Sequence, residues 1–218
     1  MRFLRDNGLT IALLLMFLCS IIGQWLAGWH VAVQDALRHG DTPIGLGAYT
    51  VSPRFLSSVF ENWESEFLQM STYVVLTAFL FQRGSAESRD PDAPPRDDLL
   101  ELQAHKPGAP AILRWGRLWR VIYSHSLGLA LFVLFLVSFV IHWTQSAQAA
   151  AQDAIEHGEP AQGVFDYLGD AQLWFESFQN WQSEFLSTAA LVVLSIWLRQ
   201  HDTPESKPVA APHGQTGA

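Results

Sequence analysis

The nine residues Phe-Glu-Asn-Trp-Glu-Ser-Glu-Phe-Leu at positions 60–68 return at positions 178–186 as Phe-Gln-Asn-Trp-Gln-Ser-Glu-Phe-Leu. We call these two segments the repeated motif. Each copy opens an apolar run, and each run ends at a basic residue, Arg83 in the first and Arg199 in the second. A polar motif at the start of a long apolar segment, used twice, indicates a membrane protein with an internal repeat.

Apolar residues make up 49% of the 218-residue chain and collect into four runs. The runs cover about residues 9–29, 67–81, 127–143 and 185–198. A helix rises ~1.5 Å per residue, so ~20 residues cross the hydrocarbon layer of a bilayer. The first and third runs are long enough as they stand. The other two reach that length only if their helices begin near Asn62 and Asn180, which places Glu66 and Glu184 within the outer edge of the membrane.

The repeat extends well beyond the motif. Residues n and n+118 align without a gap from about Leu9 to Gln82, and Gln34-Asp35-Ala36, for example, returns as Gln152-Asp153-Ala154. Each repeat is predicted to be a helical hairpin consisting of a helix, an outer loop and a helix. Because a hairpin crosses the bilayer an even number of times, both copies have the same orientation. Parallel repeats of this kind are related by a pseudo-twofold axis along the membrane normal.

The distribution of lysine and arginine predicts the orientation, because short basic segments stay on the cytoplasmic side. The N-terminus, the central connection and the tail hold most of them: Arg2, Arg5, Arg83, Arg89, Arg96, Lys106, Arg114, Arg117, Arg120, Arg199 and Lys207. The loop of the first hairpin is flanked only by Arg38 and Arg54, and that of the second hairpin has no Lys or Arg. We therefore expect a multi-pass protein with both termini and the central linker in the cytoplasm.

Helix-ending glycines and N-cap residues set the expected bounds. Gly40 and Gly158 are typical C-terminal stops, while Ser52 and Asp170 are good N-caps. These signals predict a first hairpin at 1–83, with helices at about 9–39 and 53–82, and a second hairpin at 121–199, with helices at about 121–157 and 171–199. Between the hairpins we expect a disordered cytoplasmic linker at 84–110 and a basic amphipathic segment at 111–120. A disordered cytoplasmic tail is expected at 200–218. Helices of this length project beyond the bilayer on the outer side. The expected fold is thus an all-α membrane protein with four transmembrane helices.

Polar residues at a similar depth on the four helices form the candidate site. They are Gln24, Asn62, Glu66, His142, Asn180 and Glu184. Ionisable groups inside a membrane are costly, so one hypothesis is that this ring binds a cation or relays protons. The other is that the acidic groups complement helix dipoles while the amides bond to neighbouring helices. On this second reading the group of Glu61, Glu64 and Glu66 is shallow enough to need no special role.

Tryptophans of the repeated motif and of its partner helices lie at the predicted outer boundary, where indole rings favour the interface. We expect Trp25, Trp63, Trp143 and Trp181 to be interfacial anchors. A zinc site drawn from His142, Glu66 and Glu184 lacks the short ligand spacing of known sites, so no metal and no cofactor is expected. The motifs of nucleotide-binding loops and nucleophile elbows are absent, so we expect no enzymatic activity.

The net charge of −8 argues against nucleic acid as a partner, because phosphate binding needs a basic surface. The expected partner is the lipid bilayer, and a homo-oligomer or another membrane protein is left open. Two functions are compatible with the sequence. One is a structural or protein-interaction role in the membrane, and the alternative is a small ion- or proton-handling transporter or channel subunit that uses Glu66 and Glu184.

Three segments carry a resemblance to a known family. They are Arg5-Asp6-Asn7-Gly8-Leu9, Glu61-Asn62-Trp63-Glu64-Ser65-Glu66-Phe67-Leu68-Gln69 and Phe81-Gln82-Arg83-Gly84-Ser85-Ala86-Glu87-Ser88. On these residues the chain resembles a family of uncharacterised bacterial integral membrane proteins, defined as a domain of unknown function. The resemblance implies a bacterial source and an integral membrane location. We expect that location to be the bacterial cytoplasmic (inner) membrane. It implies no activity, cofactor or functional residues.

Overall fold

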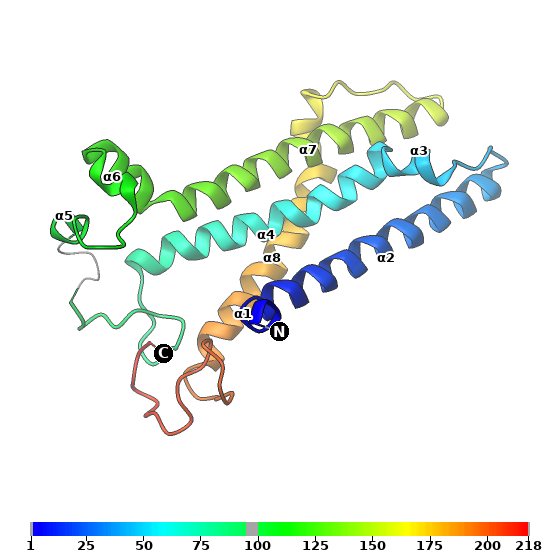
Figure 1. Cartoon of the computed structure of the whole chain (residues 1–218). Coiled ribbons are helices and arrows are strands. Elements are labelled where there is room, and N and C mark those ends of the chain that lie inside the picture. Colours follow the sequence, from blue (N-terminus) through cyan, green and yellow to red (C-terminus); the bar gives the residue numbers. More distant parts are fainter. Residues whose placement is uncertain (1, 95–99, 218) are drawn as a thin grey trace. The chain divides into compact units, whose positions relative to one another are not determined.

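The computed structural model describes residues 2–94 and 100–217, and the described part is helical with no strand (Figure 1). Residues 95–99, which belong to the expected linker, lie outside the described residues. The chain forms two compact units, each assembled from segments that are distant in sequence. The first unit combines Met1–Val59 with Ile141–Tyr167, and the second combines Phe60–Val140 with Leu168–Ala218.

The first unit contains α1 (Arg2–Asp6), α2 (Gly8–His39), α3 (Leu46–Thr50), the first turns of α4 (Pro53–Phe79) and the last turns of α7 (Ser126–Glu156). Gly40 ends α2 as the sequence predicts, because it adopts a left-handed φ of 79° and its N–H donates to the carbonyl of Ala36. The bounds of α2 lie within one residue of the expected 9–39. None of its residues is buried.

Tyr49 of α3 anchors the loop of this unit to α2. The side chain is 5% exposed, and a Cβ atom at Gly28 of α2 would lie only 2.2 Å from its hydroxyl oxygen. The absence of a Cβ atom at Gly28 therefore leaves the room that the Tyr49 side chain occupies. Two tryptophans of α2 secure the same loop, with the Trp25 indole donating to Thr50 Oγ1 at 2.9 Å and the Trp29 indole to the Ile44 carbonyl at 2.9 Å.

The second unit contains the remainder of α4 and of α7, α5 (Leu100–Gln103), the short helices η1 (Ala111–Arg114) and η2 (Asp166–Gly169, which begins in the first unit), α6 (Arg117–Ser124) and α8 (Ala171–Leu194). Asp170 caps α8 as expected, because its carboxylate accepts from the N–H of Gln172 at 2.8 Å. Leu173 in the first turn of α8 is fully buried.

Three helix ends differ from the expected bounds. The helix expected at 53–82 ends at Phe79, and the one expected at 171–199 ends at Leu194. The helix expected at 121–157 begins only at Ser126, because His125 separates it from α6. In the first two cases apolar residues continue past the helix end, so hydrophobic patterning alone placed the boundary too far along the chain. In the third case apolar residues of α6 precede α7, so patterning placed its start too early.

Two helices, α2 and α7, are long and apolar enough to cross a membrane. By composition α4 and α8 do not reach this level. Both helices carry the polar residues of the repeated motif, which on α4 include the three glutamates Glu61, Glu64 and Glu66. Two candidate spans are thus evident from length and composition.

Candidate functional site: the polar contact between α4 and α8

Both copies of the repeated motif lie on helices of the second unit, the first on α4 and the second on α8. Several of their polar side chains bind one another. We call this set of contacts the α4–α8 polar seam, and it comprises Glu61, Glu64, Glu66, Gln69, Asn180, Trp181, Glu184 and Thr188.

Glu64 is the most deeply placed member of the seam. Its side chain is fully buried, and its Oε1 accepts a hydrogen bond of 2.9 Å from the indole nitrogen of Trp181. A buried carboxylate is costly unless donors replace the water that it has lost. A hydrogen bond with one charged partner is stronger than one between neutral groups, so this contact helps to offset the cost.

Trp181 is itself held by aromatic neighbours. Its ring meets that of Phe178 edge-on with centroids 5.4 Å apart, and that of Phe135 on α7 at 6.4 Å. Edge-to-face arrangements of this kind are favourable for aromatic rings. The indole nitrogen is thereby directed to Glu64, and the ring bridges α7 and α8 within the second unit.

Two further hydrogen bonds cross the seam. Asn180 Nδ2 donates to Glu61 Oε1 at 2.5 Å and to the Glu176 carbonyl at 3.1 Å. About two turns further along both helices, Gln69 Nε2 donates to Thr188 Oγ1 at 2.5 Å. The seam therefore extends over about two turns of both helices. Amide and hydroxyl groups used between helices in this way are typical of helix packing.

Glu66 and Glu184 occupy equivalent positions in the two motif copies, and the negative charge of Glu66 acts on the Glu184 carboxylate. Glu66 is exposed and Glu184 half-buried. Like charges brought together in this way are unfavourable unless a proton, a cation or solvent lies between them.

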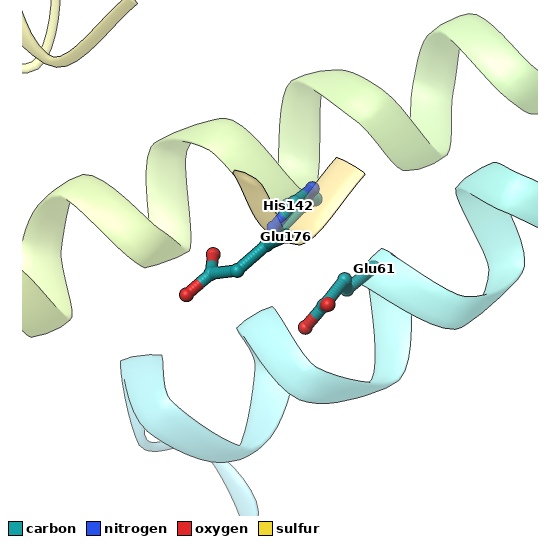
Figure 2. Close-up of side chains that lie close together, drawn as sticks. All are labelled: Glu61, His142 and Glu176. Carbon is teal, nitrogen blue, oxygen red and sulfur yellow. The ribbon is translucent and has the colours of Figure 1, made fainter. Parts of the chain in front are cut away.

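A second pair of carboxylates adjoins the seam. Figure 2 shows the side chains of Glu61 on α4 and Glu176 on α8, and an oxygen of one lies within 4.8 Å of an oxygen of the other. Both glutamates are half-buried.

The seam contacts share one numerical property. The residues that meet differ by 119 positions for Glu61 with Asn180, by 117 for Glu64 with Trp181, and by 119 for Gln69 with Thr188. Because this difference is nearly constant, the contacts advance in the same direction along both helices, so α4 and α8 run parallel and in register over this stretch. The difference also equals, within one residue, the offset between the two repeats.

The predicted ring of six polar residues is divided between the two units, and it stays a prediction as a whole. In the first unit the Gln24 amide donates to Ser58 Oγ at 3.3 Å, and His142 on α7 is fully buried. In the second unit Asn180 and Glu184 belong to the seam, as does Glu66. Asn62 is exposed.

The four expected anchor tryptophans are all half-buried. Trp143 donates to the carbonyl of Val164 at 2.8 Å, just as Trp25 and Trp181 donate to partners within their own units. The Trp63 ring packs edge-on against Phe60 at 5.0 Å. The indole nitrogens of Trp25, Trp143 and Trp181 therefore bind protein groups, and a role at the membrane interface stays a prediction.

Sequence reasoning missed Glu64, which was set aside as shallow. The helical spacing of the three glutamates was the available signal. Glu64 is one turn beyond Glu61, so these two share a helix face, whereas Glu66 lies on a different face. Helical periodicity groups these residues correctly, yet it leaves undecided which group is turned towards α8.

A second cluster that the sequence did not predict surrounds Lys207 in the tail. The tail was expected to be disordered, yet this side chain is fully buried, and its ammonium lies within hydrogen-bonding distance of five backbone carbonyls, among which it shares three N–H groups. The acceptors are Gly84, Ile196 at 3.3 Å, Pro212 at 3.4 Å, His213 at 2.9 Å and Gln215 at 3.0 Å. Burial, and then the positive charge of Arg199, lower the pKa of Lys207. The five acceptors oppose this by binding the charged form.

Neighbouring contacts complete this arrangement, which we call the tail clasp. The N–H of Gly217 donates to the Ser85 carbonyl at 2.9 Å, and that of Gly84 donates to Thr216 Oγ1 at 2.9 Å. Gly84 has a φ of 86°, and a Cβ atom there would lie 2.8 Å from the His213 carbonyl oxygen. The clasp therefore requires glycine at position 84.

Fold and seam together define an all-α protein with two helices suited to crossing a membrane and a repeated polar motif that binds across two further helices. The chain belongs to the family described as domain of unknown function DUF6766, whose model matches residues 1–218. The expectation of an uncharacterised domain family is thereby confirmed. Comparison with curated proteins and with solved structures gave no match.

Proposed function

We propose that the chain is an integral membrane protein with a structural or protein-interaction role, in which α2, α4, α7 and α8 all cross the bilayer as two tandem hairpins. The observation that carries this proposal is the α4–α8 polar seam. Its amide and indole donors bind carboxylate and hydroxyl acceptors on the opposite helix, as groups that fix helix packing do.

The exposed apolar surface supports placement in a membrane. No residue of α2 is buried, and its large apolar side chains, such as Leu13, Leu15 and Met16, are more than half exposed. In water such a surface would drive association. Lipid, a second copy of the chain or another membrane protein are the partners that would cover it.

The seam also supports spans made by α4 and α8 despite their polar residues. In hydrocarbon, polar groups are tolerated where protein partners satisfy them. The offset of 117–119 residues between seam partners supports the pseudo-twofold arrangement, because residues near such an axis meet their own counterparts in the other repeat.

Cysteine labelling tests the topology. In a Cys19→Ser background, single cysteines replace Thr42 and Gln162 in the hairpin loops, and Ala93 and Ala210 in the linker and tail. A membrane-impermeant thiol reagent is expected to label the first two in intact bacterial cells and the last two only after permeabilisation, because the hairpin loops lack the basic residues of cytoplasmic segments. Labelling of all four alike, or recovery of the protein in the soluble fraction, would contradict the proposal.

The pair Glu66 and Glu184 favours a second candidate, an ion- or proton-handling transporter or channel subunit. Two neighbouring carboxylates can share a proton or a cation, which makes them candidates for transfer inside a membrane. The Glu66→Gln/Glu184→Gln double variant removes both charges and retains the side-chain size.

If this second function holds, proton or cation flux in proteoliposomes is expected to fall at least tenfold in the double variant, while reconstitution is unchanged. A matched Glu159→Gln variant at the exposed loop of the second hairpin removes a charge outside the seam and should leave the flux as it is. Equal flux in the wild type and the double variant eliminates the transport function and leaves the structural one.

A further inference from the structure

Helix α6 presents an apolar face that none of the described residues of its own unit covers. Successive residues of a helix are about 100° apart, so Leu118, Trp119, Ile122 and Tyr123 share one side. All four are exposed, with Leu118 at 67% and Trp119 at 44%. Trp115, just before the helix, is 63% exposed, and its ring packs edge-on against Trp119 at 5.8 Å.

The opposite side of α6 is basic. Arg117 and Arg120 lie there with Ser124, and Arg114 precedes the helix at the end of η1. Arg114 and Arg117 are exposed, whereas Arg120 forms an ion pair of 2.7 Å with Glu101. No acidic residue stands between Glu101 and Asp153 in the sequence. An exposed apolar face flanked by arginines is characteristic of helices that lie in the plane of an anionic membrane surface.

The position of α6 in the chain indicates the same partner. Only His125 separates it from α7, one of the two helices suited to crossing a membrane, and Figure 1 shows α6 at the N-terminal end of α7. If α7 crosses the bilayer, its first residue, Ser126, lies at the headgroups. Glycine at position 116 has a φ of 117°, and it turns the chain between η1 and α6.

We infer that α6, together with Trp115 and Arg114, is an interfacial helix that binds anionic phospholipids at the membrane surface. This rests on the proposed membrane crossing and names a partner for it. Leu118, Ile122 and the two tryptophans enter the headgroup boundary, and Arg114 and Arg117 bind lipid phosphates. The exposed arginines make the contact depend on lipid charge and on salt.

The test uses the full chain in nanodiscs, with Cys19→Ser as background and an environment-sensitive dye on a single cysteine. Leu118→Cys reports on the apolar face and Ser124→Cys on the polar face. In discs of phosphatidylcholine mixed with phosphatidylglycerol, quenching by iodide is expected to be several-fold weaker at position 118 than at 124, with bluer emission. In pure phosphatidylcholine, or at high salt, the difference should shrink.

The Arg114→Gln/Arg117→Gln variant should lose the dependence on phosphatidylglycerol, whereas the matched Arg38→Gln/Arg54→Gln variant in the first hairpin should retain it. Equal quenching at positions 118 and 124 in both lipids overturns the inference. Shielding at 118 that ignores lipid charge, or that needs two chains in a disc, overturns it in favour of a protein partner. Failure of the chain to remain in discs contradicts the membrane crossing itself, which separates the two claims.

Discussion

Replacing Trp181 by alanine is expected to lower the free energy of unfolding by about 3–5 kcal/mol, among the largest effects of any single substitution in this chain. The ring contacts with Phe135 and Phe178 are lost together with the hydrogen bond to buried Glu64. Thermal unfolding in detergent, followed by circular dichroism, measures the loss as a fall in Tm of several degrees or more.

Trp181→Phe separates these two contributions. It retains a ring but leaves the Glu64 carboxylate without its indole donor, at an expected cost of about 1–3 kcal/mol. Combining it with Glu64→Gln should cost less than the sum of the two single variants, because a neutral amide tolerates the loss better than a carboxylate.

Trp174→Phe is the matched control for this series. The Trp174 indole donates to the Leu168 carbonyl at 2.8 Å at the exposed start of α8, so its loss leaves no buried charge. Its effect should be well under that of Trp181→Phe. Equal effects of the two substitutions, or additive effects of Trp181→Phe and Glu64→Gln, would show that the seam does not depend on the buried carboxylate.

The second large effect is expected from Lys207→Met, which retains a long side chain but removes the ammonium. Five backbone carbonyls lose their shared donor, at an expected cost of about 1–3 kcal/mol to the tail clasp. Since ~1.4 kcal/mol corresponds to a tenfold change in an equilibrium, exchange of the Gly217 amide hydrogen should accelerate by roughly five- to a hundredfold. Hydrogen exchange followed by mass spectrometry resolves this segment.

Lys106→Met provides the control, because Lys106 is exposed and is also followed by proline. It should leave exchange in the tail unchanged. Gly84→Ala should release the tail independently of the lysine, since its Cβ atom would meet the His213 carbonyl. If the amide hydrogens of the tail exchange as rapidly in the wild type as in Lys207→Met, the tail is disordered, as its composition predicts, and the clasp does not form.

The repeated motif, its helical character and the start of α4 at Pro53 followed from the sequence, because local signals specify them: an apolar run, an N-cap and a repeat offset. Helix ends did not, since apolar residues continue beyond Phe79 and Leu194 while the backbone has already left the helix. Local patterning indicates which residues favour burial, but it does not determine the residue at which a helix ends.

The membership of the seam needed the tertiary structure. Helical spacing separates Glu61 and Glu64 from Glu66, yet only the rotation of α4 about its axis, fixed by packing within the second unit, turns Glu64 to Trp181 and leaves Glu66 exposed. The burial of Lys207 depends in the same way on carbonyls from Gly84 and Ile196, more than 100 and about 10 residues away.

By itself, then, the sequence determined an all-α chain with two strongly apolar helices and a motif used twice, because periodicity and composition are local properties. Only the tertiary structure decided how that motif is used. Hydrogen bonds between α4 and α8 select Glu64, Trp181 and Asn180 from several equivalent polar residues, because a long-range contact depends on the distance and orientation of both partners.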